Sequence, residues 1–333
     1  MALENGKIMN LMKSKILRIK GDASFRKFYR LILNKKSKII VIARKEKYKN
    51  LVAYTAINKF LRSNGILAPK LYNHDIQKGI VIIEDFGDKT YYYLLSKNSN
   101  KFIIYKKIIN LLIKIQKINP KAKIKNNIKG FHRINKYSKK YLFEETDLFF
   151  DWYLPIFLTK EKVLKIKNKS RKVLNKIYNK LNFPNSYFVH RDFHAQNLMK
   201  VGKKIGVIDS QDALIGNPAY DLVSLIDDVR IKTSKKIKIK IYNYYLKKRS
   251  KIYKLDQQKF LDDFHILSVQ RSLKIIGIFS RLFKRDKKKK YLKLIPYTWR
   301  LLDMRMKSKN FFPLKNILDK NINKKIRRKI LYK

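Results

Sequence analysis

The first 88 residues alternate between short apolar runs and polar turns, a pattern typical of β-strands. Strands are predicted where β-branched and aromatic residues cluster, at 16–19, 28–33, 39–43, 71–73 and 80–83. Apolar residues at helical spacing predict a helix over 51–61, which ends at Asn64-Gly65. We therefore expect a small lobe of five strands and one helix, about 85 residues long.

From residue 89 onward the apolar positions recur every three or four residues, which is the period of an α-helix. Helices are predicted at 102–118, 143–158, 161–181, 237–253, 260–283 and 291–306. Two short strand-like segments interrupt them, at 197–201 and 205–208. The predicted fold class is α+β, with an N-terminal β-sheet lobe (1–88) and a large, mostly helical C-terminal lobe (89–333).

The charge of the chain is extreme. Lys and Arg number 81 against 24 Asp and Glu, which gives a net charge of +57. The lysines are spread along the whole chain and accompany many Ile and Asn residues, the types favoured by A+T-rich codons. We interpret the charge as codon bias, and expect nucleic-acid binding to be non-specific only.

Three features that the sequence lacks limit the class of protein to which the chain can belong. The chain has no Cys, which excludes disulfide scaffolds, cysteine-ligated zinc, iron–sulfur clusters and thiol nucleophiles. Its apolar stretches fall far short of the roughly 18 uncharged residues that span a bilayer. The N-terminus also lacks the apolar core of a secretory signal. We expect a cytoplasmic protein with no membrane partner.

Candidate chemistry is concentrated in the segment 190–197, with the sequence HRDFHAQN. It carries the carboxylate of Asp192 and the amide of Asn197, and a second carboxylate, Asp209, follows a strand-like segment. Transfer of a γ-phosphoryl group uses such a set: one Asp orients the attacking hydroxyl, while an Asn and another Asp hold Mg²⁺. Oxygen ligands suit Mg²⁺ and not zinc. A lone His-Arg-Asp triplet is usually structural, but the Asn and Asp that follow in order favour the catalytic interpretation.

These motifs resemble those of the aminoglycoside phosphotransferase/choline kinase superfamily, over the stretches 189–199, 206–213 and 220–225. Three further stretches narrow the resemblance to bacterial N-acetylmuramate/N-acetylglucosamine anomeric kinases of cell-wall recycling: 21–26, 83–88 and 270–282. The resemblance covers about 17 to about 305 and implies a protein-kinase-like, two-lobed fold with ATP and Mg²⁺ as cofactors. It makes Asp192 the catalytic carboxylate and Asn197 with Asp209 the metal ligands.

The resemblance also implies a nucleotide site in the N-terminal lobe. A turn over the phosphates is formed by Gly21, Asp22, Ala23 and Ser24, for which the alternative is an ordinary hairpin turn. A hinge whose backbone pairs with adenine is formed by Glu84, Asp85 and Phe86. Arg44 and Lys45 follow the third strand and are candidates for contact with phosphates.

The sequence departs from the superfamily pattern at two places. Ser210 stands where a Phe commonly follows the metal-binding Asp, so that the packing behind Asp209 is expected to differ. Kinase-like folds also usually pair a strand Lys with a helix Glu, but the predicted helix carries no acidic residue over 51–62. The partner of the strand cation is therefore unassigned.

Four further residues are candidates for contact with the acceptor, each with a structural alternative. His190 and His194 are either base catalysts or loop scaffolding, and His194 is also a candidate substrate contact. Asp212, like Asp221, binds ion or substrate or else braces a loop. Trp152, next to Tyr153, either stacks on a sugar ring or packs in the core. Arg271 is a candidate partner for a lactyl carboxylate, as is Arg281, although Arg is also common on surfaces.

The predicted activity is ATP-dependent phosphorylation of a small sugar, at the anomeric hydroxyl of N-acetylmuramate or N-acetylglucosamine. One alternative is a related phosphotransferase acting on an aminoglycoside, choline or homoserine. Another is a basic polyanion-binding protein on a relic kinase fold. A relic is expected to have lost one of Asp192, Asn197 and Asp209, and all three are present.

Overall fold

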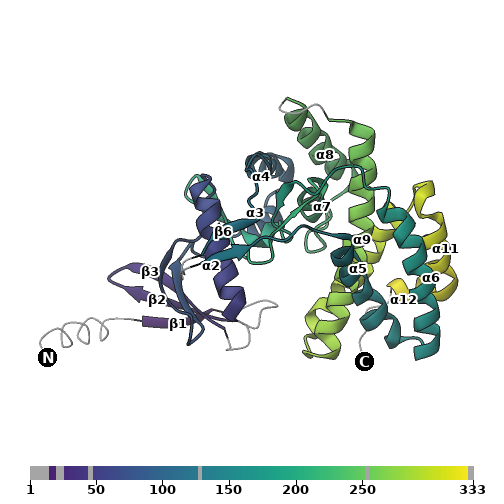
Figure 1. Cartoon of the computed structure of the whole chain (residues 1–333), viewed down its shortest axis with the longest axis horizontal. Helices are drawn as coiled ribbons and strands as arrows, with labels where there is room; N and C mark the ends of the chain where they lie inside the picture. Colours follow the sequence, from purple (N-terminus) through teal and green to yellow (C-terminus); the bar gives the residue numbers. More distant parts are fainter. Residues whose placement is uncertain (1–14, 20–25, 44–47, 127–129, 252–254, 329–333) are drawn as a thin grey trace, which may run out of the picture. The chain divides into compact units, whose positions relative to one another are not determined.

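The computed structural model describes residues 15–19, 26–43, 48–126, 130–251 and 255–328 (Figure 1). Contacts between Cα atoms divide the chain into two compact units. The sheet unit comprises Met1–Lys97, Lys121–Ile134 and Ala195–Ala213, and the helical unit comprises Asn98–Pro120, Asn135–His194 and Leu214–Lys333. The expected boundary between residues 88 and 89 stays a prediction.

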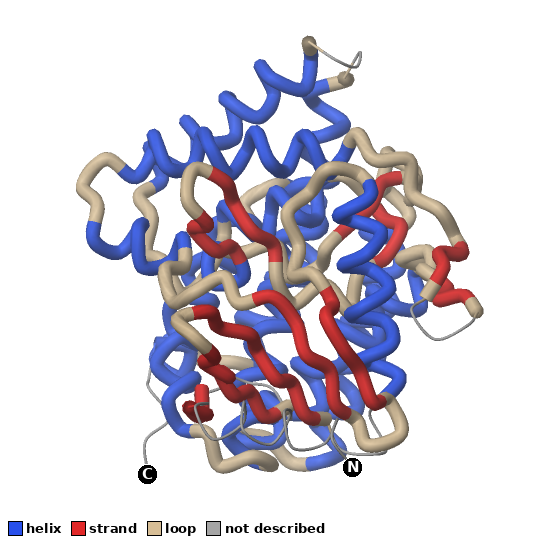
Figure 2. Tube along the Cα trace, turned by 90° about the vertical axis from the view of Figure 1, so that its left-hand side faces the viewer, coloured by secondary structure: helices blue, strands red, loops and turns tan. Residues whose placement is uncertain are grey.

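The sheet unit is built on a five-stranded antiparallel sheet in the order β1-β2-β3-β5-β4 (Figure 2, strands in red). The elements are β1 (Lys15–Ile19), β2 (Lys27–Leu33), β3 (Lys36–Ile42), α2 (Tyr48–Ser63), β4 (Leu71–Asp75) and β5 (Ile80–Glu84). Helix α2 packs on the sheet, because Leu51 and Tyr54 share a buried core with Val41 and Val81. The predicted five strands and one helix are confirmed.

A second part of the sheet unit comes from later in the chain. It includes α3 (Tyr91–Lys97), β6 (Lys123–Lys125), β7 (Phe131–Arg133), a 3-10 turn (Ala195–Asn197), β9 (Leu198–Val201) and β10 (Lys204–Val207). Strands β9 and β10 form an antiparallel hairpin at the two strand-like segments that the sequence predicts. The hairpin is joined to the earlier chain by backbone hydrogen bonds from Val207 to Leu67 (2.8 Å) and from Lys200 to Lys89 (2.7 Å).

The helical unit is organised around α9, a helix of 28 residues that contacts α5, α7 and α10 (Figure 1). Its helices are α4 (Lys101–Gln116), α5 (Lys139–Leu148), α6 (Lys160–Tyr178), α7 (Ala219–Ile226), α8 (Lys235–Ser250), α9 (Gln257–Lys284), α10 (Ile295–Arg305), α11 (Phe312–Asn321) and α12 (Lys324–Arg328). A short antiparallel pair, β8 (Tyr187–Val189) with β11 (Leu214–Gly216), completes it. The predicted α+β class is confirmed.

The helix predicted at 143–158 is not continuous. Helix α5 ends at Leu148 and is followed by a π-helical turn (Phe149–Tyr153) and a 3-10 turn (Leu154–Ile156). The change occurs where α9 lies close to the backbone, because a Cβ atom on Gly277 would lie 2.2 Å from the carbonyl carbon of Leu148. The periodicity of the sequence predicts the buried face here, but the unwinding depends on a helix more than 100 residues away.

Other elements were not predicted at all. The sequence analysis found two strand-like segments beyond residue 89, whereas the structure also contains the β6–β7 and β8–β11 pairs. Helices α3, α7, α11 and α12 are short, and α7 is buried throughout, so that it has no polar face to create a helical period.

The segment predicted as a helix at 291–306 begins as a 3-10 turn (Lys289–Leu294) before α10.

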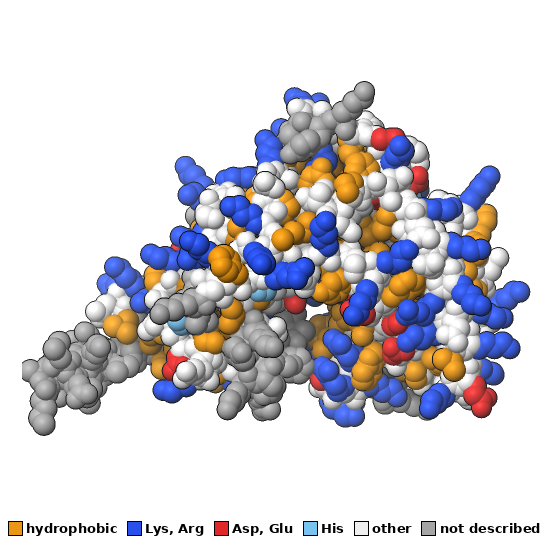
Figure 3. All heavy atoms as spheres, viewed as in Figure 1, with side chains coloured by type: hydrophobic (Ala, Val, Ile, Leu, Met, Phe, Trp, Pro, Cys, Tyr) orange, Lys and Arg blue, Asp and Glu red, His pale blue; other side chains and the backbone are white. Residues whose placement is uncertain are grey.

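Lys and Arg side chains are scattered over the face shown in Figure 3, with hydrophobic side chains between them. This distribution agrees with the spread of lysines along the sequence. In the part of the chain that the structure describes, none of the helices has the length and apolarity that a membrane-spanning segment requires.

Candidate active site

The loop that carries Asp192 follows β8 in the helical unit. Its backbone is held by Asp221 of α7, whose carboxylate accepts hydrogen bonds from the N–H groups of His190 (2.7 Å) and Arg191 (3.0 Å). Asp221 is 1% exposed, and its burial raises its pKa to about 7. Asp221 therefore braces the loop, which is one of the two roles that the sequence analysis considered for it.

Arg191 adopts a left-handed backbone conformation, with φ of 73°, which is uncommon for a residue with a side chain. Its carbonyl oxygen accepts hydrogen bonds from Nη1 of Arg271 (3.0 Å) and Oγ of Ser224 (3.4 Å). Its guanidinium forms an ion pair with Glu145, with Nε 3.1 Å from Oε1. Such a conformation persists when its surroundings hold it from several sides, as they do here.

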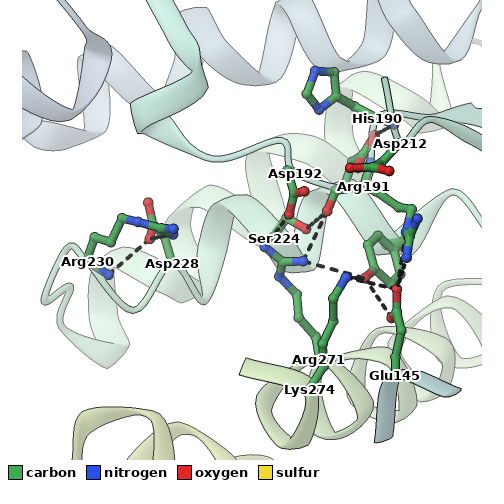
Figure 4. A network of polar contacts seen from close by, with 12 residues as sticks. Glu145, His190, Arg191, Asp192, Asp212, Ser224, Asp228, Arg230, Arg271 and Lys274 are labelled. Carbon is green, nitrogen blue, oxygen red and sulfur yellow. Dashed lines mark hydrogen bonds and ion pairs between the residues drawn. The ribbon is translucent and has the colours of Figure 1, made fainter. Parts of the chain in front are cut away.

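Glu145, on α5, is the centre of a buried polar network (Figure 4). Besides Arg191, its carboxylate accepts hydrogen bonds from Tyr137 (2.5 Å), Gln270 (2.7 Å), Lys274 (2.9 Å) and Tyr220 (3.3 Å). Burial alone would raise the pKa of Glu145, but the positive charges of Lys274 and Arg191 outweigh it and lower the pKa to about 2. Glu145 therefore stays ionised and fixes the side chain of Arg191.

Glu145 is not among the site residues predicted from the sequence, although the sequence holds one signal for it. Glu145 is spaced three and four residues from Leu142 and Phe149, and all three are buried. An acidic residue on the apolar face of a helix must find partners of opposite charge, and this spacing alone would have marked it.

Asp192 lies beside two cations of α9. Its Oδ1 atom is 3.7 Å from Nη2 of Arg271. Burial would raise the pKa of Asp192, but the charges of Lys274 and Arg271 hold it well below its usual range. Its side chain is 34% exposed, so it is an ionised hydrogen-bond acceptor that solvent reaches.

Asn197 and Asp209 lie at one end of the β9–β10 hairpin, in the sheet unit. Asn197 precedes β9 and Asp209 follows β10, and the N–H group of Ile208 donates to the carbonyl oxygen of Asn197 (3.0 Å). Asp209 has φ of 64°, a left-handed conformation that Asp tolerates better than most residues. An amide oxygen and a carboxylate are suitable ligands for Mg²⁺.

The oxygen donors of Asn197 and Asp209 suit a metal ion that a second molecule also coordinates. Among the described residues, no group of three or more His, Cys, Asp and Glu is placed to hold a metal ion. Mg²⁺ in phosphotransfer sites is usually held by one or two protein groups together with water and phosphate oxygens. Asn197 and Asp209 therefore fit Mg²⁺ bound to a nucleotide better than a resident metal.

Two contacts of the loop that follows β10 were not predicted from the sequence. Arg26, just before β2, forms an ion pair with Asp209 (Nη2 to Oδ1, 2.5 Å) and donates to Oε1 of Gln211 (3.2 Å). Ser210, at the position where Phe was expected, donates from its hydroxyl to Oδ1 of Asn58 on α2 (2.7 Å), and both residues are buried. A hydrogen bond to α2 thus takes the place of apolar packing behind Asp209.

The candidate hinge follows β5, which ends at Glu84. The carboxylate of Asp85 binds the guanidinium of Arg30 (2.5 and 3.1 Å) and the N–H group of Gly87 (2.8 Å). Phe86 is buried against Gly206 of β10, where a Cβ atom would lie 2.6 Å from the ring. The hinge and the hairpin that carries Asp209 therefore pack together within the sheet unit.

Comparisons with known proteins identify the family of this chain. Residues 15–251 match the model of APH, the phosphotransferase enzyme family. The chain belongs to this family. A chain similar to it is the N-acetylmuramate/N-acetylglucosamine kinase of Caulobacter vibrioides, 29% identical over 257 residues, which cover 76% of this chain and 69% of the relative. The kinase of the same name from Neisseria meningitidis is 27% identical over 283 residues, which cover 83% and 81%.

Solved structures show the same fold as this phosphotransferase. The ADP-bound aminoglycoside phosphotransferase APH(2'')-Ib matches with a TM-score of 0.61 at 14% identity, over 93% of this chain and 99% of that one. A choline/ethanolamine kinase family protein from Mesorhizobium loti matches with a TM-score of 0.62 at 11% identity, over 96% and 99%. At these identities the likeness establishes the fold alone.

The remaining candidates of the phosphotransferase lie in varied surroundings. His194 is buried, and burial with the nearby charge of Arg230 holds its pKa well below the usual range, so that it is neutral. Trp152 is half-buried in the π-helical turn, whereas Tyr153 is in the core and accepts a hydrogen bond from Trp299 (3.0 Å).

Asp212 is exposed and accepts a hydrogen bond from the side chain of Gln211 (3.1 Å). Several nucleotide-site candidates cannot be placed in the same way. They lie outside the described residues: Gly21, Asp22, Ala23, Ser24, Arg44 and Lys45. The roles assigned to all these residues stay predictions.

Proposed function

We propose that this phosphotransferase is an ATP-dependent kinase that phosphorylates the anomeric hydroxyl of N-acetylmuramate or N-acetylglucosamine in cell-wall sugar recycling. The observation that carries the proposal is the position of the Asp192 carboxylate, 3.7 Å from Arg271 and on a loop held by Glu145 and Asp221. The names of the two relatives support the choice of acceptor.

Asp192 suits an acceptor hydroxyl that is already acidic. A carboxylate whose pKa is held low is a weak base, but it accepts a hydrogen bond strongly and orients the hydroxyl. The anomeric hydroxyl of a sugar is more acidic than an ordinary alcohol, so that a weak base suffices. In this proposal Asp192 aligns the hydroxyl and takes its proton as the sugar oxygen bonds to the γ-phosphorus. The bond from that phosphorus to the bridging oxygen breaks, and ADP leaves. Positioning then provides most of the rate enhancement.

The sheet unit supplies the residues proposed to hold the nucleotide. Bound Mg²⁺·ATP would supply the γ-phosphoryl group and neutralise the charge that develops on it. Asn197 and Asp209 would hold the metal through oxygen atoms, and the backbone of 84–86 would pair with adenine. The turn at 21–24 and the cations Arg44 and Lys45 would contact the phosphates.

The helical unit supplies three of the four proposed acceptor contacts, Trp152, His194 and Arg271. The half-buried ring of Trp152 offers an aromatic face to the C–H side of a sugar. His194 is neutral, so that it exchanges hydrogen bonds with a sugar hydroxyl without carrying a charge. The guanidinium of Arg271 is already bound to the carbonyl oxygen of Arg191 and lies near Asp192, so its proposed contact with a lactyl carboxylate would add to those interactions.

An acceptor panel tests the proposal. Purified protein is incubated with ATP, Mg²⁺ and, separately, N-acetylmuramate, N-acetylglucosamine, choline, homoserine and an aminoglycoside, and ADP release is measured. Turnover with the two amino sugars, absent from the Asp192→Asn variant, is expected. Turnover confined to choline, homoserine or the aminoglycoside would identify the protein as another kinase of the superfamily.

A further inference from the structure

Arg26 is a cation placed at the carboxylate that is proposed to hold the metal. Its Nη2 atom lies 2.5 Å from Oδ1 of Asp209, and Nη1 donates to Oε1 of Gln211 at 3.2 Å. The side chain of Arg26 is 13% exposed, against 37% for Asp209. The pair is therefore set into the sheet unit, and the carboxylate is its more accessible partner.

Aromatic rings limit the positions that this guanidinium can take. Its central carbon lies 5.7 Å from the ring centre of Phe28 and 5.6 Å from that of Tyr54. Tyr54 is 5% exposed, and burial raises its pKa to about 12, so that it stays neutral. A guanidinium near such rings keeps its charge and loses little freedom when it binds an anion.

The ion pair differs from the one expected for a kinase-like fold. Helix α2 contains no Asp or Glu, so no acid of this helix can pair with a cation of the sheet. The helix is instead linked to the metal-binding loop by the neutral hydrogen bond between Asn58 and Ser210. The charge of Arg26, the residue before β2, is directed at Asp209 itself.

We propose that Arg26 is a cation of the phosphate site: it balances the charge of Asp209 and attracts the phosphates of a nucleotide whose metal Asp209 holds. This inference rests on the proposed role of Asp209 as a metal ligand. Two opposite effects follow from Coulomb's law. A guanidinium beside Asp209 repels a divalent ion that arrives alone, and it attracts a nucleotide that carries several negative charges.

Binding measurements on the Arg26→Gln variant test this pair of effects without an acceptor sugar. Mn²⁺ alone, followed by its paramagnetic signal, is expected to bind about fivefold more tightly than to the wild type. Mg²⁺·AMP-PNP, followed by calorimetry, is expected to bind about tenfold more weakly. Arg133→Gln, which removes the same charge from an exposed position of β7, is expected to change neither affinity.

A residue with a purely structural role would not produce opposite changes. Equal weakening of both ligands in Arg26→Gln, or no change in either, would overturn the proposal. Asp209→Asn separates this failure from that of the metal site. If Asp209→Asn abolishes Mn²⁺ binding and Arg26→Gln changes nothing, the role of Arg26 alone is wrong. If Asp209→Asn leaves Mn²⁺ binding unchanged, the metal site and the role of Arg26 both fail.

Arg26→Lys is a second variant that tests the proposal if Arg26→Gln does not fold. Lys retains the positive charge but lacks the planar fork that binds Asp209 and Gln211 together. Its affinity for Mn²⁺ is expected to equal that of the wild type, with nucleotide binding weakened about threefold at most. A loss of more than about tenfold in both would contradict the proposal.

Discussion

Arg271 and Asp192 lie side by side in the helical unit, with Nη2 of the guanidinium 3.7 Å from Oδ1 of the carboxylate. The same guanidinium donates to the carbonyl oxygen of Arg191, whose backbone is in the left-handed region. Arg271 thus acts on Asp192 in two ways, through its charge and through the shape of the loop. The proposed catalytic carboxylate is both ionised and fixed in position.

Replacement of Asp192 by Asn tests its role in catalysis. The amide keeps the size of the side chain but cannot take a proton, so kcat is expected to fall about 100-fold or more. The affinity for nucleotide is expected to change little. Steady-state kinetics and calorimetry with the correctly folded variant measure both quantities, and near-normal turnover would contradict the assignment.

Replacement of Glu145 by Gln tests the buried network that holds Arg191. The ionised carboxylate has a pKa of about 2 in the folded protein, below its ordinary value of 4.5. It therefore stabilises the fold above pH 4.5, and this contribution is lost as the pH falls toward about 2. Glu145→Gln is expected to lower the free energy of unfolding at pH 7 by about 3 kcal/mol.

Denaturant unfolding at several pH values measures this loss. The dependence of stability on pH below 4.5 is expected to be weaker in Glu145→Gln than in the wild type. Glu144→Gln is the matched control, because Glu144 is the neighbouring acid on α5, 54% exposed and 3.9 Å from Lys140. A loss of stability as large in Glu144→Gln as in Glu145→Gln would show that the buried network stabilises the fold no more than an exposed acid does.

The link between Ser210 and Asn58 is expected to stabilise the sheet unit. Ser210→Ala leaves the buried amide of Asn58 without this hydrogen bond, and a loss of about 1–2 kcal/mol is expected. The double variant with Asn58→Ala is expected to show a coupling energy of about 1 kcal/mol between the two sites. Strictly additive losses in thermal or denaturant unfolding would mean that the hydrogen bond does not stabilise the fold.

The net charge of +57 is expected to produce weak, length-dependent binding to DNA, without sequence preference. Binding should fall steeply between low and physiological salt, because it depends on the release of counterions. Kinase activity is expected to persist when residues 287–290 are all changed to Gln. Tight, sequence-selective binding at physiological salt, lost in that variant and without phosphotransfer to any sugar, would make nucleic-acid recognition the function.

Local patterns in the sequence predict much of the fold. Alternation and clustering predict β1 to β5. The helical period predicts α2, α4, α6, α8 and α9, because each of these helices buries part of its surface. The π-helical turn after Leu148 has a different origin. It depends on the approach of α9 at Gly277, and such a contact between distant segments leaves no local pattern.

The candidate site likewise contains residues that local motifs predict and residues that they do not predict. Asp192, Asn197 and Asp209 stand in short motifs with fixed spacing, so the sequence predicts them as a group. Glu145 and Arg26 act through partners that are far away in the chain, and Arg26 is separated from Asp209 by 183 residues. The contacts of Glu145 and Arg26 with these partners do not follow from the spacing of residues in the sequence, because only the fold brings the partners together.

The proposed reaction transfers phosphate to an anomeric oxygen, so the position of the new phosphate on the sugar is the decisive measurement. Protein, Mg²⁺·ATP and N-acetylmuramate or N-acetylglucosamine are incubated, and the product is analysed by ³¹P–¹H correlation NMR. If the anomeric hydroxyl is phosphorylated, the product gives a phosphorus signal coupled to the anomeric proton of the sugar. We expect the wild type to form this product and Asp192→Asn not to form it. A phosphorus signal coupled instead to the protons on carbon 6, or ATP hydrolysis with no sugar phosphate at all, would contradict it.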